Sequence, residues 1–154
     1  MPATGNRDPA TGAAGNMRPA SYVLYAMNAR ELMTDYLGAA RRGDWETAFG
    51  YFAEDMHIRI PGRSAWAGER RGKELAVGYI QSVRDRYRNG RIELELIDML
   101  AGDERVALLV RERFHGDGPP VEIRRANVYT VRNDEIVEIS IFEGDQYAVD
   151  ELLH

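Results

Sequence analysis

An acidic and a basic residue interrupt two alternating patterns in the second half of the chain, and their types could do chemistry. In residues 105–115, Glu112 falls on the face that is otherwise apolar. In residues 121–132, Arg125 shares a face with Asn127. If the two segments form a hairpin, Glu112 and Arg125 lie within a residue or two of facing each other. We therefore predict a pair in which Glu112 is a general base and Arg125 tunes it or binds an anionic substrate group.

A structural explanation of the same pair also exists. Glu112 and Arg125 could form an ion pair at the rim of a cavity, or Glu112 could face solvent if the strand register shifts by one residue. With the expected register, the inward face also carries three residues that we expect to bind the substrate: Val110, Arg125 and Tyr129.

Other kinds of chemistry lack their residues. The chain has no cysteine, which excludes a thiolate zinc site, a cysteine nucleophile and a disulfide scaffold. His57, His115 and His154 do not have the spacing of metal ligands, and no glycine-rich phosphate loop is present. We therefore expect neither a metal nor a nucleotide cofactor. The charged run that includes Arg84, Arg86 and Arg88 is interpreted as a solvated helix face.

Three helices are expected to precede the strands that carry these residues. The first begins at the N-cap Asn28, with Glu31 completing a capping box, and continues to about Ala40. The second is predicted from Asp44 through Phe52, and the third over residues 72–89. Alternation and turn residues then predict strands over residues 56–60, 91–96, 105–115, 121–132 and 135–142.

This order predicts an α+β fold. Three N-terminal helices would pack on a strongly curved, mostly antiparallel sheet that forms a cone-shaped barrel. The concave face of such a sheet leaves a cavity next to the first helix, where a small ligand can bind.

Composition limits the classes of protein. The 154 residues are 44% hydrophobic and 29% charged, with a formal net charge of −5. These values fit one globular domain and argue against a membrane span and a nucleic-acid partner. We predict a disordered N-terminal tail over residues 1–25, one domain over residues 26–154, and a cytoplasmic location.

Several short motifs resemble a known superfamily. They are the segment from Met33 to Trp45 with its Arg-Arg-Gly-Asp-Trp end, Tyr51-Phe-Ala-Glu-Asp-Met, Ile60-Pro-Gly, the segment 127–138, and Gly144-Asp-Gln-Tyr-Ala-Val-Asp. Their order and spacing resemble the nuclear transport factor 2-like superfamily, and within it the ketosteroid isomerases and SnoaL-like polyketide cyclases. The resemblance implies the cone-shaped fold and a homodimer, but not one reaction.

The resemblance also implies roles for single residues. Tyr36 matches the oxyanion-hole tyrosine of the isomerases, and a phenol there can donate to an enolate oxygen. Asn127 matches an aspartate of both groups; its amide can still donate a hydrogen bond, but it cannot transfer a proton at neutral pH. Alternatively, Tyr36 is a core residue and Asn127 bonds the backbone. Ile60 stands where the isomerases have their catalytic aspartate, which weakens a steroid isomerase mechanism and leaves Ile60 as a substrate contact.

The loop over residues 63–68 and the C-terminal segment complete the candidate site. Trp66 is expected to cover the cavity mouth as a lid, although it could equally fill a gap beneath the loop. Asp145 and Asp150 are expected to cap or anchor the C-terminal segment.

Three functions fit these residues. The first is a cyclase or isomerase of polyketide-type secondary metabolism that binds a hydrophobic, oxygenated small molecule, with Tyr36, Asn127 and Glu112 as catalytic residues. The second is a non-catalytic small-ligand-binding protein of the same fold. The third is an epoxide-opening hydrolase, which needs two carboxylates and an arginine in the pocket; the sequence offers no evident second acid.

Overall fold

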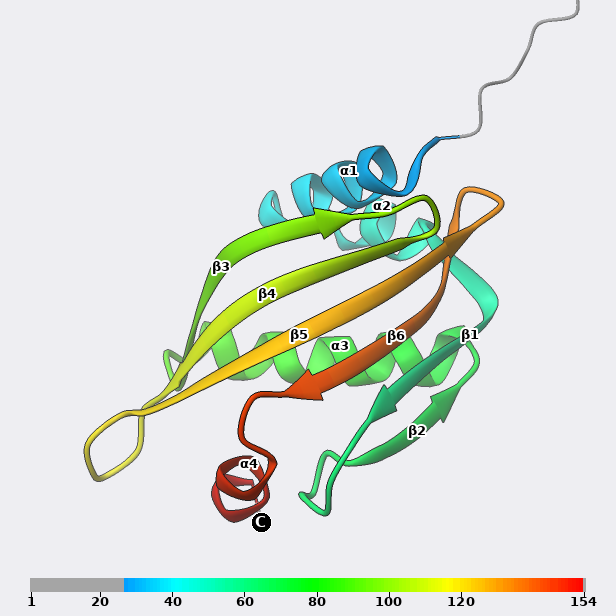
Figure 1. Cartoon of the computed structure of the whole chain (residues 1–154). Coiled ribbons are helices and arrows are strands. Elements are labelled where there is room, and N and C mark those ends of the chain that lie inside the picture. The colour runs from blue at the N-terminus through cyan, green and yellow to red at the C-terminus, as the bar shows by residue number, and fades with distance from the viewer. Residues whose placement is uncertain (1–26, 154) are drawn as a thin grey trace, which may run out of the picture.

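The computed structural model describes residues 27–153, and the tail predicted over residues 1–25 lies outside them. The described chain forms one open six-stranded sheet with four helices (Figure 1). The helices are α1 (Ala29–Arg41), α2 (Trp45–Gly50), α3 (Lys73–Arg88) and α4 (Gln146–Leu152). The strands are β1 (Phe52–Ile60), β2 (Gly68–Arg71), β3 (Ile92–Ala101), β4 (Arg105–Phe114), β5 (Val121–Arg132) and β6 (Glu135–Glu143).

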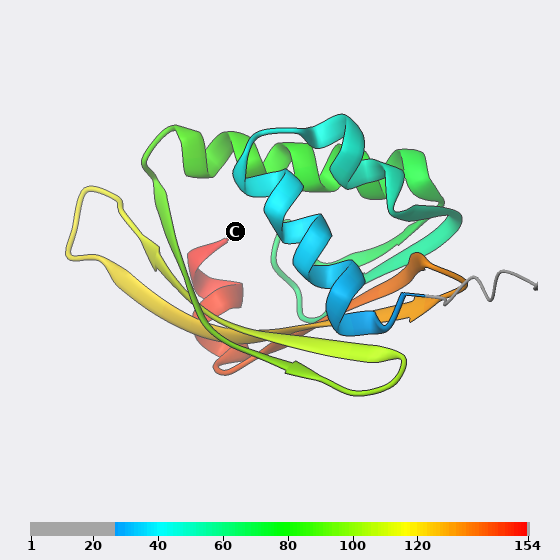
Figure 2. The same ribbon diagram turned by 90° about the horizontal axis from the view of Figure 1, so that it is seen from above.

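The sheet is strongly curved, and α1 and α3 lie on its concave side (Figure 2). The strand order is β2-β1-β6-β5-β4-β3, with β1 parallel to β6 and the other neighbours antiparallel. The expected α+β class and the mostly antiparallel sheet are confirmed. The sheet does not close into a complete barrel, because β2 and β3 remain as edges.

Local sequence signals determine where α1 and the last hairpin lie. The capping box is present: the Glu31 backbone N–H donates to the Asn28 side chain, and the Asn28 N–H donates to the Glu31 carboxylate. Between β5 and β6, Asn133 and Asp134 have φ angles of 50° and 61°. Two consecutive positive φ values are typical of the tight turn that matches strand twist, and asparagine and aspartate tolerate them.

Three local expectations need correction. The second helix ends at Gly50, and Phe52 begins β1, where it pairs with Ile136 of β6. Sequence periodicity cannot reveal that pairing, because the partner is more than 80 residues away. The charged strand β2 and the short helix α4 were not predicted, since neither carries a clear apolar period.

The inner face of the sheet carries two apolar clusters. The larger joins the buried side of α1 (Leu32, Met33 and Tyr36) to β1, β4, β5 and β6. The smaller consists of Ile92, Phe114, Ile123 and Val149, so α4 closes the concave side at the other end of the sheet. Between residues 27 and 153, no helix is long and apolar enough to cross a membrane.

Candidate active site

A cavity of about 380 Å³ lies between the helices and the inner face of the sheet. Its size is that of a small-molecule site. Its wall is mostly apolar, with a few polar groups directed toward the same space. The lining residues come from α1, α2, α3, β3, β4 and β5; among them are Tyr36, Leu37, Trp45, Ile80, Tyr87, Leu96, Leu108, Val110, Glu112, Asn127 and Tyr129.

Two phenols and an amide form one polar group in this wall. The rings of Tyr36 and Tyr129 lie 5.9 Å apart, and both residues are buried. Burial raises the pKa of Tyr36 to about 12, while its hydrogen bond with Tyr129 acts in the opposite direction. The pKa of Tyr129 is raised well above its usual value, by burial first, then by the negative charge of ionised Tyr36, and then by the hydrogen bond with Tyr36. Both phenols are therefore protonated at neutral pH. When one hydroxyl donates to the other, the O–H of the second remains available to a ligand.

Asn127 lies two residues from Tyr129 on the same face of β5 and also lines the cavity. Its Oδ1 atom is buried and has no hydrogen-bond partner among residues 27–153. A buried amide oxygen without a partner is costly in a folded protein, so Oδ1 is available to accept a hydrogen bond from a ligand. The donor of the same amide is its Nδ2 group.

The carboxylate of Glu112 is the acidic group of the cavity wall, and its residue is only 3% exposed. The Tyr87 hydroxyl donates to Glu112 Oε1, and Arg125 Nη1 lies 3.1 Å from Glu112 Oε2. The pKa of Tyr87 is raised by burial first and then by the Glu112 charge. A carboxylate has about four acceptor positions, so these two contacts leave Glu112 able to accept a proton.

Arg125 also contacts a second acid that the sequence analysis missed. Its Nε atom lies 3.1 Å from Glu143 Oε2, and the Glu143 side chain is only 3% exposed. The predicted strand stopped at Phe142, one residue too early. Alternation from Ile139 and Ile141 would have placed Glu143 on the inner face. Arg125 and Glu143 do not line the cavity themselves; they lie behind Glu112.

The oxyanion donors and the carboxylate lie at different positions along the sheet. Asn127 pairs with Leu108, whereas Glu112 pairs with Ile123, four residues further along each strand. Four residues of strand span about 13 Å. Part of this distance is covered by the side chains, but a ligand that contacts both groups must extend along the strands.

The structure brings Tyr36, Asn127, Glu112, Val110 and Tyr129 to one cavity, whereas three expected substrate contacts, Arg125, Ile60 and Trp66, do not line it. Arg125 lies behind Glu112 and is directed toward the two carboxylates. Ile60 belongs to the large apolar cluster and pairs with Gly68 of β2, so it does not line the cavity. Trp66 is not a lid over it, because the ring packs on the smaller cluster and stacks under Arg86, 4.1 Å from its Cζ.

Hydrogen bonds to the C-terminal segment hold the loop of Trp66 in place. Asp150 Oδ1 accepts from the backbone N–H groups of Arg63 and Ser64, at 2.8 and 3.0 Å. Asp145 is the N-cap of α4 and accepts from the Ala148 N–H at 3.0 Å. The expectation that these two aspartates cap or anchor the C-terminal segment is confirmed.

The arginines of α3 divide between two surroundings, contrary to their interpretation as one solvated face. Arg84 and Arg88 line the cavity, together with Arg41 at the end of α1. Arg86 instead borders a second hollow beside α4. Arg84 and Arg88 are four residues apart and therefore lie on the same side of α3, whereas Arg86, two residues from each, lies on a different side.

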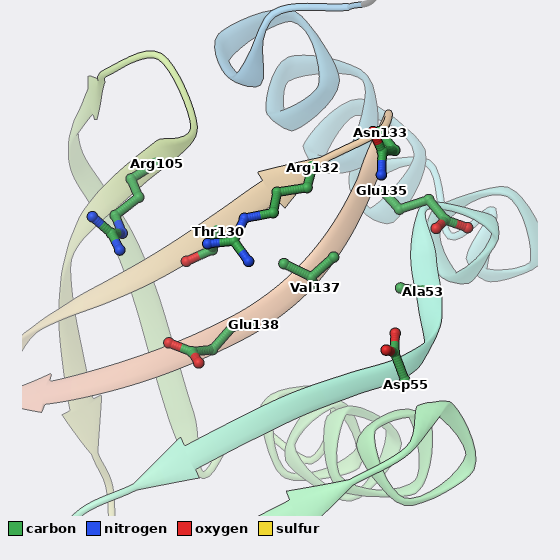
Figure 3. A pocket seen from close by; sticks show the side chains of 9 residues that line it. All are labelled: Ala53, Asp55, Arg105, Thr130, Arg132, Asn133, Glu135, Val137 and Glu138. Atoms are coloured by element: carbon green, nitrogen blue, oxygen red, sulfur yellow. The ribbon is translucent and has the colours of Figure 1, made fainter.

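A further hollow of about 450 Å³ lies on the opposite face of the sheet (Figure 3). Arg105, Thr130 and Glu138 project there from neighbouring strands. The hollow lacks an apolar wall and is therefore a weaker candidate for a substrate site. Within residues 27–153, no group of three or more His, Asp or Glu side chains could hold a metal ion.

Comparisons with known proteins agree with this architecture. The model of the SnoaL-like domain family matches residues 33–139. Bal32a, from a soil-derived mobile gene cassette, is 25% identical with a TM-score of 0.68, over 81% of this chain and 95% of that chain. An NTF2-like protein from Burkholderia xenovorans is 21% identical with a TM-score of 0.67, over 84% of this chain and 99% of that chain.

A third similar structure is TerC, co-crystallised with polyporic acid. It is 16% identical with a TM-score of 0.63, over 80% of this chain and 96% of that chain. No functionally curated protein matches the sequence. The solved structures support the nuclear transport factor 2-like fold, and the family match covers the residues that build the cavity.

Proposed function

The chain belongs to the SnoaL-like domain family, and from this premise we propose that it is a cytoplasmic cyclase or isomerase of polyketide-type secondary metabolism. Its substrate is a hydrophobic, oxygenated small molecule that binds in the cavity below α1. The observation that carries the proposal is that Tyr36, Asn127 and Glu112 line one mostly apolar cavity. TerC, with its polyporic acid, is another protein of this fold with a small-molecule ligand.

The proposed reaction starts with proton transfer to Glu112. The carboxylate removes a proton from a carbon next to a carbonyl group, and the C–H electrons form an enolate. Tyr36 and the Asn127 amide donate hydrogen bonds to the enolate oxygen. In a cyclisation, the enolate carbon attacks a second carbonyl carbon, and Glu112 returns its proton to the new alkoxide. In an isomerisation, the proton returns to a different carbon.

The geometry of the wall suits an extended substrate. Because Glu112 and Asn127 lie about four strand residues apart, charge must travel from the carbon near Glu112 to an oxygen near Tyr36. A conjugated or polyoxygenated skeleton carries charge over such a distance. Much of the remaining rate enhancement would come from holding that skeleton in a folded conformation inside an apolar cavity.

Arg125 and Glu143 support this mechanism from behind the wall. Arg125 holds the Glu112 carboxylate by one side of its guanidinium and Glu143 by the other. An epoxide-opening hydrolase needs both carboxylates at the substrate, but only Glu112 lines the cavity. The site therefore favours the cyclase or isomerase over the hydrolase.

We also propose that the partner is a second copy of this chain, bound at the outer face of the sheet. That face carries an apolar strip, defined by Leu100, Leu109, Val128 and Phe142, and the helices of the described chain lie on the other side (Figure 2). Leu100 and Phe142 are 52% and 58% exposed. A contiguous apolar surface with charged borders is typical of a homodimer interface.

Enolate formation can be tested without the natural substrate. The wild-type protein in D2O should catalyse exchange of deuterium into the methylene carbons of an extended aryl 1,3,5-triketone, whose enol chain carries charge from the exchanging carbon toward a distant carbonyl oxygen. NMR follows this exchange. Glu112→Gln should slow this exchange by about 10²-fold or more because the base is lost. Tyr36→Phe and Asn127→Leu should each slow it by about 10²-fold because an oxyanion donor is lost.

Tyr147→Phe is the matched control, since that phenol is 79% exposed and remote from the cavity wall; it should exchange at the wild-type rate. If Tyr36→Phe and Asn127→Leu both exchange like the wild type, the oxyanion site is wrong. Tight binding of the triketone without any exchange would instead identify a non-catalytic ligand-binding protein.

A further inference from the structure

Three arginines from two helices border the cavity of the proposed active site. Arg41 lies in the last turn of α1, and Arg84 and Arg88 lie one turn apart on α3. Arg41 and Arg88 are exposed, whereas the Arg84 side chain is only 23% exposed. The mouth of an apolar cavity is therefore strongly basic, in a protein whose net charge is −5.

These arginines have almost no acidic partners in the part of the chain that the structure describes. Within residues 27–153, Arg41 and Arg88 make no ion pair, and Arg84 meets only the adjacent Asp85, at 3.8 Å. Arg84 Nε is buried without a hydrogen-bond partner in the same residues. The Arg84 guanidinium lies over the Trp45 ring, 5.1 Å from its centroid, so the group is held in position. A buried donor without a partner calls for an acceptor from a ligand.

The inside of the cavity does not neutralise this charge. Among residues 27–153, Glu112 is the only acidic residue in the wall, and Arg125 already pairs with it at 3.1 Å. Basic residues near a helix C-terminus interact favourably with the helix dipole and so stabilise the helix. This interaction explains the presence of exposed arginines such as Arg86 and Arg88 in the last turn of α3. The dipole does not explain why Arg84, a turn earlier, is half-enclosed beside Trp45 at the same cavity.

We propose that the substrate of this cavity carries a carboxylate, which Arg41, Arg84 and Arg88 hold at the mouth. The apolar body of the substrate then extends inward toward Tyr36 and Asn127. The planar guanidinium matches a carboxylate by two parallel hydrogen bonds, and three of them determine which end of the molecule enters first. This inference rests on the proposed function for the identity of the cavity, and it names the substrate class: an aromatic or polycyclic acid rather than a neutral ketone or ester.

A matched pair of probes tests the charge alone. The acid 6-hydroxy-2-naphthoate and its neutral amide 6-hydroxy-2-naphthamide have nearly the same shape, and their affinities are measured by calorimetry. The wild type should bind the acid at least about 10-fold more tightly than the amide, and added salt should reduce this preference. In Arg41→Gln/Arg88→Gln the preference should fall to about 2-fold or less, with amide affinity unchanged.

The control is Arg42→Gln/Arg86→Gln, which removes the same charge from the ends of the same helices, at residues that do not line the cavity. It should keep the wild-type preference, and circular dichroism establishes that both double variants are folded. An equal loss in the control, equal wild-type affinities for acid and amide, or no saturable binding of the acid at about 1 mM would each overturn the inference. The preference remains measurable even if deuterium exchange fails, so the two proposals fail separately.

Discussion

Arg125 contacts two buried carboxylates at once, and this shapes the acid–base behaviour of the site. Its Nη1 and Nε atoms each lie 3.1 Å from an acidic oxygen, of Glu112 and Glu143 respectively. One positive charge between two negative ones leaves an excess of one negative charge in a buried place. Burial raises the pKa of Glu143 above its usual range, and the Glu112 charge adds to the rise, against the attraction of Arg125.

This raised pKa predicts how stability depends on pH. Folded Glu143 holds its proton more tightly than the unfolded chain, whose value is near 4.5. The stability from this group is therefore complete below that pH and is lost as pH rises through the folded pKa. Glu143→Gln imitates the protonated form and should not show this loss. The difference in Tm between Glu143→Gln and wild type should grow in favour of the variant from pH 4.5 to 7.

Glu135→Gln, at an exposed position, serves as the control and should show a nearly constant difference in Tm over the same range. A Glu143→Gln difference that stays constant or reverses its sign would show that Arg125 outweighs burial.

At the scale of elements, the contact between the loop after β1 and α4 replaces the expected lid. Gly62 has a φ of +92°, a conformation that favours glycine. A Cβ atom there would overlap with the Gln146 amide and with Asp150 Oδ1, the oxygen that accepts from Arg63 and Ser64. A side chain at residue 62 would have to displace the Gln146 and Asp150 side chains, in addition to adopting a strained backbone conformation.

Gly62→Ala should lower the stability by about 1–3 kcal/mol, because it adds backbone strain and displaces the Asp150 contact. Urea unfolding followed by circular dichroism measures this change. Gly116→Ala is the matched control, since a Cβ there meets nothing within 4 Å and φ is not positive; it should change stability little. Equal stabilities of the two variants would mean that the loop is not held by this contact.

At the scale of the whole molecule, the open sheet has one face covered by helices and one that carries the apolar strip (Figures 1 and 2). The hollow around Arg105 and Glu138 lies at one end of that outer face and carries both signs of charge (Figure 3). A two-fold arrangement can bring such opposite charges of two copies together.

The proposed homodimer predicts different results for two equally exposed residues. Phe142 in the strip is 58% exposed, and Leu75 on α3 is 59% exposed. Phe142→Glu should shift the protein from dimer to monomer because it places a charge in the interface, while Leu75→Glu should not. Light scattering after size exclusion measures both. A monomeric wild type, or a dimer that Phe142→Glu leaves intact, contradicts the proposed interface.

Local patterns in the sequence determined the parts of the protein that depend on near neighbours. The capping box at Asn28, the turn at Asn133–Asp134 and the alternation of β4 and β5 are all set by residues close in the chain. Because alternation fixes the face of a residue, it also predicted that Glu112 and Asn127 share an inner face. The resemblance to a known superfamily supplied the cone-shaped fold around them.

Tertiary structure alone decided which side chains meet. The pairing of β1 with β6, the second acid Glu143 behind Arg125, and the position of Trp66 beneath Arg86 all join residues distant in sequence. So does the arginine-bordered mouth, which combines Arg41 of α1 with Arg84 and Arg88 of α3. Periodicity tells which face a residue occupies, but the neighbour across a gap depends on how helices and sheet pack, and that packing is a property of the whole chain.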